Sequence, residues 1–207
     1  MKHTILLKLV KRLLDILIAV FGLLLVFPFF IVIYFLVLLS SRGPVLYKQT
    51  RVGQFNRDFK LLKFRTMYLD SDKGSLLTLG DNDSRITPIG YFLRKFKLDE
   101  LPQLINVLKG EMSLVGPRPE VRKYVDLYTE SQLSVLNLKP GITDMASIKY
   151  VDENVILAKF DEPEQAYIKH IMPDKININL ESSELSQSAL GSIKIIGLTV
   201  KSILLKK

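Results

Sequence analysis

The fold of this chain is decided by one stretch, ILIAVFGLLLVFPFFIVIYFLVLL (residues 16–39), in which no residue is charged. A helix needs roughly 20 consecutive apolar residues to cross a bilayer. The run is too long for the apolar part of a signal peptide, and no cleavage site of small residues follows it. It therefore predicts a membrane-embedded helix near the start of this sequence.

Two features argue against a simple membrane span. Pro28 lies in the middle of the run, where it removes a backbone hydrogen bond and kinks a helix. Lysines and arginines flank the run on both sides, which favours a cytoplasmic position for both ends. A helix-break-helix hairpin explains both features, because each half, about 18 Å long, is too short to cross a hydrocarbon core of about 30 Å. A kinked spanning helix is the alternative.

Composition narrows the class of protein further. The 207 residues carry a formal net charge of +8, yet 48% of them are hydrophobic. A basic chain that is this apolar predicts a protein on an anionic membrane surface, with membrane lipids rather than nucleic acid as its partner. Cysteine is absent, and His3 and His170 are too few for a histidine-based metal site.

The chain after the apolar stretch predicts an α+β domain that is mostly helical. Residues 44–49 and 59–67 have the composition of two short strands. A turn that contains Gly53 and Asn56 would join them into a short β-hairpin.

Three further helices are predicted in this domain. Thr87 and Pro88 form a cap and first-turn pair that begins one helix. Residues 99–110 predict a second helix with Asp99 as its N-cap, and residues 164–172 predict a third. The second helix carries its apolar side chains at helical spacing, namely Leu101, Leu104, Ile105 and Leu108.

The last residues, 189–207, predict an amphipathic helix with Lys194 and Lys201 on its polar side. We favour a helix that lies on a membrane surface. A helix packed on the domain core is the alternative. The apolar side consists of Leu190, Ile193, Ile196, Val200, Ile203 and Leu204.

Three polar patterns are candidates for function. Asp81-Asn82-Asp83 has the D-x-D form of metal-binding loops, although a polar turn before a helix explains it as well. Arg118 lies between two prolines, whose rigid backbone suits bidentate phosphate binding, and an ordinary surface arginine is the alternative. Asp99 and Glu100 are adjacent, and neighbours on a helix point about 100° apart. They therefore predict two roles, one as nucleophile and one as metal ligand.

The block RKFKLDELPQLINVLKGEMSLVGPRPE (residues 94–120) carries a resemblance to a known family. Together with KRLLD (11–15), GPVLYKQTRVG (43–53), KFRTM (63–67) and KPGIT (139–143), it resembles the bacterial monotopic phosphoglycosyl transferases. These proteins are also called bacterial sugar transferases or polyprenyl-phosphate sugar-1-phosphate transferases. The spacing between LDELPQL and GPRP makes the resemblance specific.

The resemblance implies an enzyme that transfers a phospho-sugar from a UDP-sugar to polyprenol (undecaprenyl) phosphate. The products would be a polyprenyl diphosphate sugar and UMP, in the first membrane step of polysaccharide or glycoconjugate assembly. Asp99 would be the nucleophile that forms an aspartyl phospho-sugar, and Glu100, with Asp99, would hold the Mg²⁺ that the family requires. The candidates for binding substrate phosphates are Arg94, Arg118, Lys63, Arg65 and Lys149.

The resemblance also implies a location and a division of the chain. The protein would be monotopic on the cytoplasmic face of the bacterial inner membrane, and a homo-oligomer is one expected assembly. A re-entrant membrane helix broken at Pro28 would span residues 1–41, a cytoplasmic catalytic domain residues 42–188, and a membrane-surface helix residues 189–207.

The sequence departs from the family pattern in two places. Phe27 stands where many members have Ser before the membrane proline, and Val151 stands where an arginine is expected, with Lys149 as the candidate replacement. Two other function classes compete with the enzyme: a catalytically silent membrane scaffold, and a D-x-D glycosyltransferase that acts on a lipid-linked sugar. Loss of UMP release in Asp99→Asn would separate the three.

Overall fold

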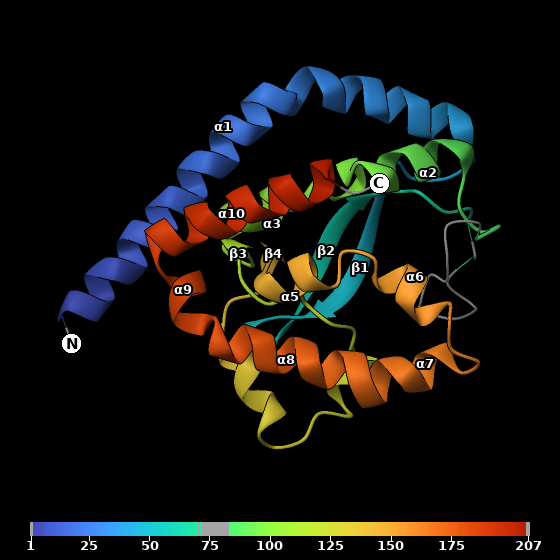
Figure 1. The fold of residues 1–207 in the computed structure, drawn as a ribbon. Helices are drawn as coiled ribbons and strands as arrows, with labels where there is room; N and C mark the ends of the chain where they lie inside the picture. The colour runs from blue at the N-terminus through green and yellow to red at the C-terminus, as the bar shows by residue number, and fades with distance from the viewer. Residues whose placement is uncertain (1, 70, 72–82, 206–207) are drawn as a thin grey trace.

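The computed structural model of this chain describes residues 2–69, 71 and 83–205. Figure 1 shows one long helix, α1 (Lys2–Ser40), that arches over a small domain of short helices and two two-stranded sheets. This arrangement confirms the mostly helical α+β class predicted from the sequence.

Helix α1 contains the whole apolar stretch, and its segment Leu6–Ser40 is long and apolar enough to cross a membrane. The predicted break at Pro28 is not an interruption of the helix. The helix continues through the proline, and Figure 1 shows it bent into an arch. Proline removes one hydrogen bond and displaces the carbonyl group four residues earlier, which bends a helix without having to end it.

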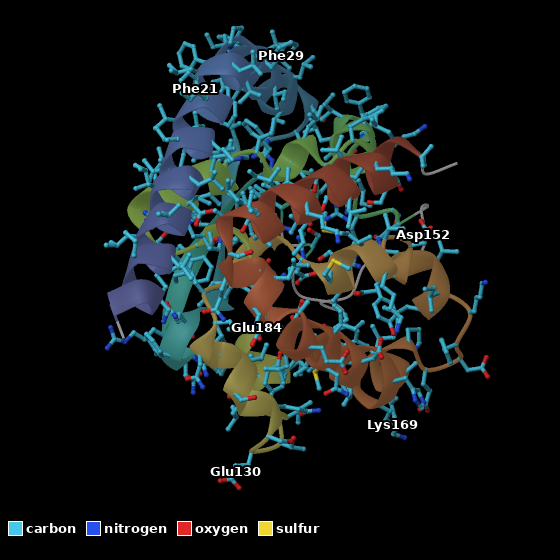
Figure 2. The ribbon with its side chains drawn as sticks, turned by 60° about the vertical axis from the view of Figure 1, so that its left-hand side comes forward. Phe21, Phe29, Glu130, Asp152, Lys169 and Glu184 are labelled. Atoms are coloured by element: carbon cyan, nitrogen blue, oxygen red, sulfur yellow. The ribbon has the colours of Figure 1, made fainter. Side chains whose placement is uncertain are left out.

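The top of the arch is apolar and uncovered. Phe21 and Phe29, which lie there in Figure 2, are 70% and 64% exposed. Glu130 lies at the opposite end of the molecule in the same view. An exposed surface built from large apolar side chains is typical of a site that contacts a membrane or another protein.

The N-terminal part of α1 is fixed to the domain by polar contacts. Arg12 donates hydrogen bonds to the backbone oxygens of Val107 at 2.8 Å and Leu108 at 3.2 Å. The buried Asp15 accepts the backbone N–H of Leu114 at 3.2 Å and forms an ion pair with Lys11, one turn earlier on the helix, at 3.5 Å.

The C-terminal part of α1 is fixed by apolar packing. Ile33 and Val37 lie in one buried cluster with Phe64 and Leu93. Ala19, on the N-terminal part, lies in a separate buried cluster of the same domain. Both ends of α1 therefore contact one body, and the exposed top of the arch lies between them.

The predicted β-hairpin is present, with its strand ends shifted by a few residues. Strand β1 (Leu46–Val52) pairs antiparallel with β2 (Asp58–Phe64) along its whole length. The turn η1 (Gln54–Asn56) joins them, and Asn56 has a φ of 60° there. Asparagine tolerates this left-handed region better than most residues, which explains its place in the turn.

Helix α2 (Pro88–Lys95) begins as predicted. Thr87 Oγ1 accepts the backbone N–H of Gly90 at 3.0 Å, and the proline occupies the first turn. A Cβ atom on Gly90 would lie 2.1 Å from Thr66 O. Glycine is therefore required for α2 to pack directly against the segment that follows β2.

The second predicted helix is divided, and Asp99 is not its cap. A single tight turn, η3 (Leu98–Glu100), precedes helix α3 (Gln103–Lys109), and no side chain caps either element. An acid before a proline resembles a cap locally, but the backbone N–H groups here bond to carbonyls three residues back. Lys97 enters the turn with a φ of 57°, and Gly110, with a φ of 84°, ends α3 as predicted.

Strand β3 (Ser113–Val115) pairs in parallel with β4 (Gly141–Thr143). The loops at this pair approach very closely. A Cβ atom on Gly116 would lie 2.2 Å from Lys139 O, and a Cβ atom on Gly141 would lie 2.1 Å from Gly116 N. Two glycines therefore bring the GPRP segment against the KPGIT segment.

Short helices form the lower part of the domain in Figure 1 and enclose a core that contains Tyr124, Leu157, Tyr167 and Ile176. The helix predicted over residues 164–172 is part of a longer run from α7 through the π-helical turn η5 to α8. The elements are α4 (Arg122–Val125), η4 (Gln132–Asn137), α5 (Met145–Lys149), α6 (Glu153–Leu157), α7 (Pro163–Ala166), η5 (Tyr167–Ile171), α8 (Met172–Glu181) and α9 (Ser183–Gln187).

Helix α10 (Ala189–Leu204) packs on the core with one face and leaves an apolar face exposed. Ile195 is fully buried, together with the small side chain of Ser192. The core-packed alternative is therefore right for this face. The membrane-surface role stays a prediction for the exposed face, which carries Leu190, Ile193, Val200 and Leu204.

Candidate active site

Glu100, in the turn η3, is the centre of the candidate site. Its buried carboxylate accepts hydrogen bonds from both terminal nitrogens of Arg118, with Nη1–Oε2 at 3.0 Å, and from Lys63 Nζ at 3.3 Å. Burial by itself raises the pKa of Glu100, but Arg118 and then Lys63 hold it well below its usual range. Glu100 is therefore a fixed negative charge that orders the cations around it.

Asp99 is buried beside Glu100 and differs from it by having an unused oxygen. Within the described residues, Asp99 Oδ1 is buried without a hydrogen-bond partner. Burial, and then the negative charge of Glu100, raise the pKa of Asp99, whereas Lys63 and Arg94 oppose the rise. A buried oxygen without a partner beside cations is suited to form a bond with an electrophile.

Arg94 reaches the site from α2. Its Nε donates to Thr66 Oγ1 at 2.9 Å, so the close packing at Gly90 also fixes this guanidinium. Burial lowers the pKa of Arg94, and the charge of Asp99 opposes that effect. Arginine stays protonated at any ordinary pH, so Arg94 is a permanent cation of the site.

The charges of the cluster favour an anionic ligand. Arg94, Arg118 and Lys63 carry three positive charges against the two negative charges of Asp99 and Glu100. Partly buried cations are screened less by salt than surface ones, so they attract and orient phosphate effectively.

The loop that carries Arg118 is held from both sides. The backbone N–H of Arg118 donates to Asp144 Oδ2 at 2.7 Å, and Asn179 Nδ2 donates to the same oxygen at 3.1 Å. On the other side, Arg51 Nη1 donates to Pro119 O at 3.1 Å. These bonds fix the backbone from which the guanidinium extends to Glu100.

The structure does not bring Arg65 to this cluster, although the resemblance makes it a phosphate-binding candidate. Its guanidinium donates to the backbone oxygens of Val37 at 3.2 Å, Ser41 at 2.6 Å and Pro44 at 2.6 Å. The first two carbonyls belong to the end of α1 and the turn after it. Arg65 therefore closes the C-terminal end of α1.

Lys149 also lies outside the cluster, and of the D-x-D motif the structure describes Asp83 alone. Lys149 Nζ forms an exposed ion pair with Asp174 Oδ2 at 2.7 Å and, within the described residues, makes no hydrogen bond or ion pair with the cluster. Asp83 forms an ion pair with Arg85 at 2.6 Å. The other two residues of the motif, Asp81 and Asn82, lie outside the described residues.

Sequence reasoning missed several residues that shape the site, among them Asp144, Gln103 and Arg51. Asp144 directly follows the KPGIT segment and is 2% exposed. The signal for it was present, since Asp144 precedes α5 and caps that helix through Ser147 N. Its hydrogen bond to Arg118 joins residues 26 positions apart. The pairing of β3 with β4 brings these two residues together, and no local pattern in the sequence indicates it.

The cluster fits a divalent cation that is shared with a substrate. Mg²⁺ is usually held by one or two carboxylates together with substrate phosphates and water. Asp99 Oδ1 has no partner in the described residues, and Glu100 Oε2 accepts only the one bond from Arg118. Among the described residues, no group of three or more acids or histidines gathers to form a complete metal cage.

The bacterial sugar transferase family model matches residues 6–206, and the chain belongs to this family. The match includes all but the first residues of α1, the candidate site and the whole of α10.

Curated relatives match from two thirds to nearly all of the chain. A UDP-N-acetylgalactosamine-undecaprenyl-phosphate N-acetylgalactosaminephosphotransferase of Aeromonas hydrophila is 42% identical over 142 residues, 67% of this chain and 34% of the relative. A UDP-glucose:undecaprenyl-phosphate glucose-1-phosphate transferase of Escherichia coli is 43% identical over 144 residues, 68% of this chain and 31% of the relative. A galactosyl transferase, CpsE, of Streptococcus agalactiae is 38% identical over 209 residues, 94% of this chain and 42% of the relative. The chain thus spans about a third to two fifths of the length of these proteins.

Proposed function

We propose that this chain transfers a phospho-sugar from a UDP-sugar to polyprenol phosphate and releases UMP. The observation that carries the proposal is the buried, unpartnered Oδ1 of Asp99 beside three cations, in a member of the bacterial sugar transferase family. The names of both relatives specify undecaprenyl phosphate, which supports polyprenol phosphate as the acceptor. They specify different UDP-sugars, so we propose the donor only as a UDP-sugar.

In the first step, a carboxylate oxygen of Asp99 attacks the phosphorus that bears the sugar. The bond from that phosphorus to the bridging oxygen breaks, and UMP leaves with the bridging oxygen and the electron pair. The product is an aspartyl phospho-sugar. Carboxylates are established nucleophiles for phosphoryl groups.

In the second step, a phosphate oxygen of polyprenol phosphate attacks the same phosphorus. The bond between Asp99 and phosphorus breaks, which restores the carboxylate and gives polyprenyl diphosphate sugar. Neither displacement needs a proton from the protein. The two substrates can therefore use the site in turn, one from water and one from the membrane.

The residues around Asp99 act by position and charge. Phosphoryl transfer is catalysed mainly by holding the reacting atoms in line and by neutralising the charge on the phosphoryl oxygens. Arg94 precedes Asp99 in the sequence and Arg118 follows it, and each supplies a guanidinium group that a hydrogen bond holds in place. Bound Mg²⁺ would neutralise charge on the donor diphosphate, with Asp99 and Glu100 as its protein ligands.

We also propose that the top of the α1 arch enters the cytoplasmic leaflet and returns to the same side. The support is that both ends of α1 contact one domain, while Phe21 and Phe29 at its top are exposed. The apolar face of α10, with the exposed Lys194 and Lys201 on the same helix, would lie on the leaflet surface.

The test of the reaction is UMP release from a panel of UDP-sugars, with undecaprenyl phosphate and Mg²⁺, by the full chain and by Asp99→Asn. We expect Asp99→Asn to lose UMP release and the radiolabelled protein adduct formed from a donor labelled in the sugar-bearing phosphate. Asp126→Asn is the matched control, since Asp126 is an exposed acid whose ion pair, at 3.9 Å, is with Arg122 and not with a residue of the cluster. Wild-type turnover in Asp99→Asn would rule out the covalent mechanism.

A further inference from the structure

Two side-chain amides lie in α3, one turn apart and both fully removed from water: Gln103 and Asn106. Asn106 is completely bonded. Its Oδ1 accepts the backbone N–H of Leu62 at 3.0 Å, and its Nδ2 donates to Lys60 O at 2.8 Å and to Glu111 Oε2 at 2.7 Å. Asn106 therefore ties α3 to β2, which is a structural role.

Gln103 is the opposite case. The side chain is 1% exposed, yet its Nε2 has no hydrogen-bond partner in the described part of the chain. Nearly all buried amide groups in folded proteins are bonded, and a donor left without a partner forfeits the free energy of its lost hydration. An apolar side chain of the same shape would pack here at lower free energy, so the fold alone does not explain the glutamine.

The position of Gln103 relates it to Asp99. The backbone N–H groups of Glu100, Leu101 and Leu104 each bond to the carbonyl three residues earlier, so the segment winds tightly through this region. On a winding of three residues per turn, side chains three apart lie one above the other, so Gln103 lies on the side of Glu100, the direct neighbour of Asp99. The described residues contain three buried side-chain polar atoms without a partner, and two of them are Asp99 Oδ1 and Gln103 Nε2.

We propose that Gln103 Nε2 donates a hydrogen bond to a phosphoryl oxygen of the group that Asp99 attacks, so that Gln103 is a substrate-binding residue. The inference rests on the proposed function and extends its site. A phosphoryl group offers an electrophilic phosphorus to the free oxygen of Asp99 and negatively charged oxygens to a donor. The ligand class is therefore the diphosphate of a nucleotide sugar, which satisfies both unpartnered atoms at once.

The side-chain N–H of Gln103 has a role that the three cations of the cluster do not fill. Lys63 and Arg118 are occupied by Glu100, and Arg94 is held by Thr66. The neutral amide of Gln103 would stabilise a charged phosphoryl oxygen through a directional hydrogen bond. Such a bond is strong only when donor and acceptor are well aligned.

The test compares Gln103→Met, which keeps the side-chain length and removes the donor, with Asn106→Leu as the matched control. We expect Gln103→Met to lower kcat/KM for UMP release by about 10- to 100-fold, as the loss of a hydrogen bond to a charged group does. Its Tm should equal or exceed that of the wild type, because no protein bond is lost. Asn106→Leu should lower the Tm, because it leaves Leu62 N–H and Lys60 O without their partner.

A second measurement does not depend on turnover. The rise in Tm that UDP-N-acetylgalactosamine or UDP-glucose with Mg²⁺ produces should be smaller in Gln103→Met than in the wild type. Wild-type turnover in Gln103→Met, an undiminished rise in its Tm with the donors, or a loss of its Tm that matches Asn106→Leu would each overturn the inference. If the wild type bound the donors without releasing UMP, the proposed reaction would fail, and the donor-induced Tm shift would still decide the role of Gln103.

Discussion

The backbone N–H of Arg118 donates a 2.7 Å hydrogen bond to Asp144 Oδ2, which joins the loop after β3 to the start of α5. The same carboxylate caps α5 through Ser147 N and accepts a bond from Asn179 on α8. One buried side chain thus connects three segments and sets the backbone from which Arg118 reaches Glu100.

Asp144→Ala should lower the free energy of unfolding by about 1–3 kcal/mol, because it removes a helix cap and leaves a buried N–H without its acceptor. Asp144→Ser should recover part of that stability, since serine also caps helices, but its shorter side chain should not restore the bond to Arg118. We therefore expect UMP release to recover less than stability does. Urea unfolding, followed by tyrosine fluorescence, and UMP release measure the two effects. Equal recovery of both in Asp144→Ser would contradict the link to Arg118.

The pH dependence of activity should have two limbs with different causes. Burial lowers the pKa of Lys63 to about 8, although the charge of Glu100 opposes this, so the folded protein loses this cation as the pH rises through about 8. On the acidic side, activity should fall as the pH drops through the pKa of Asp99, which burial raises. A pH–rate profile of wild type and Lys63→Arg checks the assignment, because arginine keeps its proton and should move the alkaline limb upward.

Stability should behave differently from activity on the alkaline side. The unfolded chain keeps the Lys63 proton up to its ordinary pKa of 10.5, whereas the folded protein releases it near 8. Since the unfolded state binds more protons between these values, Lys63 makes the free energy of unfolding rise with pH in that window. A Tm that falls in parallel with activity just above pH 8, and does so equally in Lys63→Arg, would assign the alkaline limb to unfolding.

Arg65→Ala should destabilise the protein without weakening donor binding. Its guanidinium bonds to Val37 O, Ser41 O and Pro44 O, and removing it leaves the last carbonyls of α1 without those donors. We expect a loss of about 1–3 kcal/mol. At about 2–4 °C per kcal/mol, a thermal melt resolves this change. A KM for the donor that rises at least tenfold with an unchanged Tm would restore the phosphate-binding role instead.

The arch of α1 predicts the result of cysteine labelling, which is clean in a chain without native cysteine. Single cysteines at Lys8 and Arg57, both exposed, should react with an impermeant maleimide from the same side of intact membranes. A cysteine at Leu25, which is 76% exposed at the top of the arch, should be protected by lipid and should react after detergent is added. Reaction of the Lys8 and Arg57 positions from opposite sides would establish a spanning helix.

Local signals predicted the parts of this fold that depend on neighbouring residues. The Thr87–Pro88 start of α2, the turn at Asn56 and the glycine end of α3 each follow from the conformational preference of one or two residues. The adjacent acids Asp99 and Glu100 were found because they stand together in the sequence.

Other parts depend on contacts between distant segments and could not be predicted. Asp99 resembles a cap because a proline follows, but the tight winding of η3 is set by its packing against β2 and α2. Arg65 bonds to Val37, which lies 28 residues earlier. Arg65 binds the end of a helix and not a substrate because the fold brings backbone carbonyls to its guanidinium. The residues next to Arg65 in the sequence do not indicate which carbonyls these are.

The attachment of α1 has a mechanical consequence for the site. Arg12, on one leg of the arch, is bonded to α3, while Ile33 and Val37, on the other leg, pack against α2. Those two short helices flank the turn that carries Asp99, and α2 also carries Arg94. A force that spreads or closes the two legs would therefore change the spacing between Asp99 and Arg94. With the arch in a membrane, as proposed, the thickness and lateral pressure of that membrane would act on the geometry of the proposed reaction.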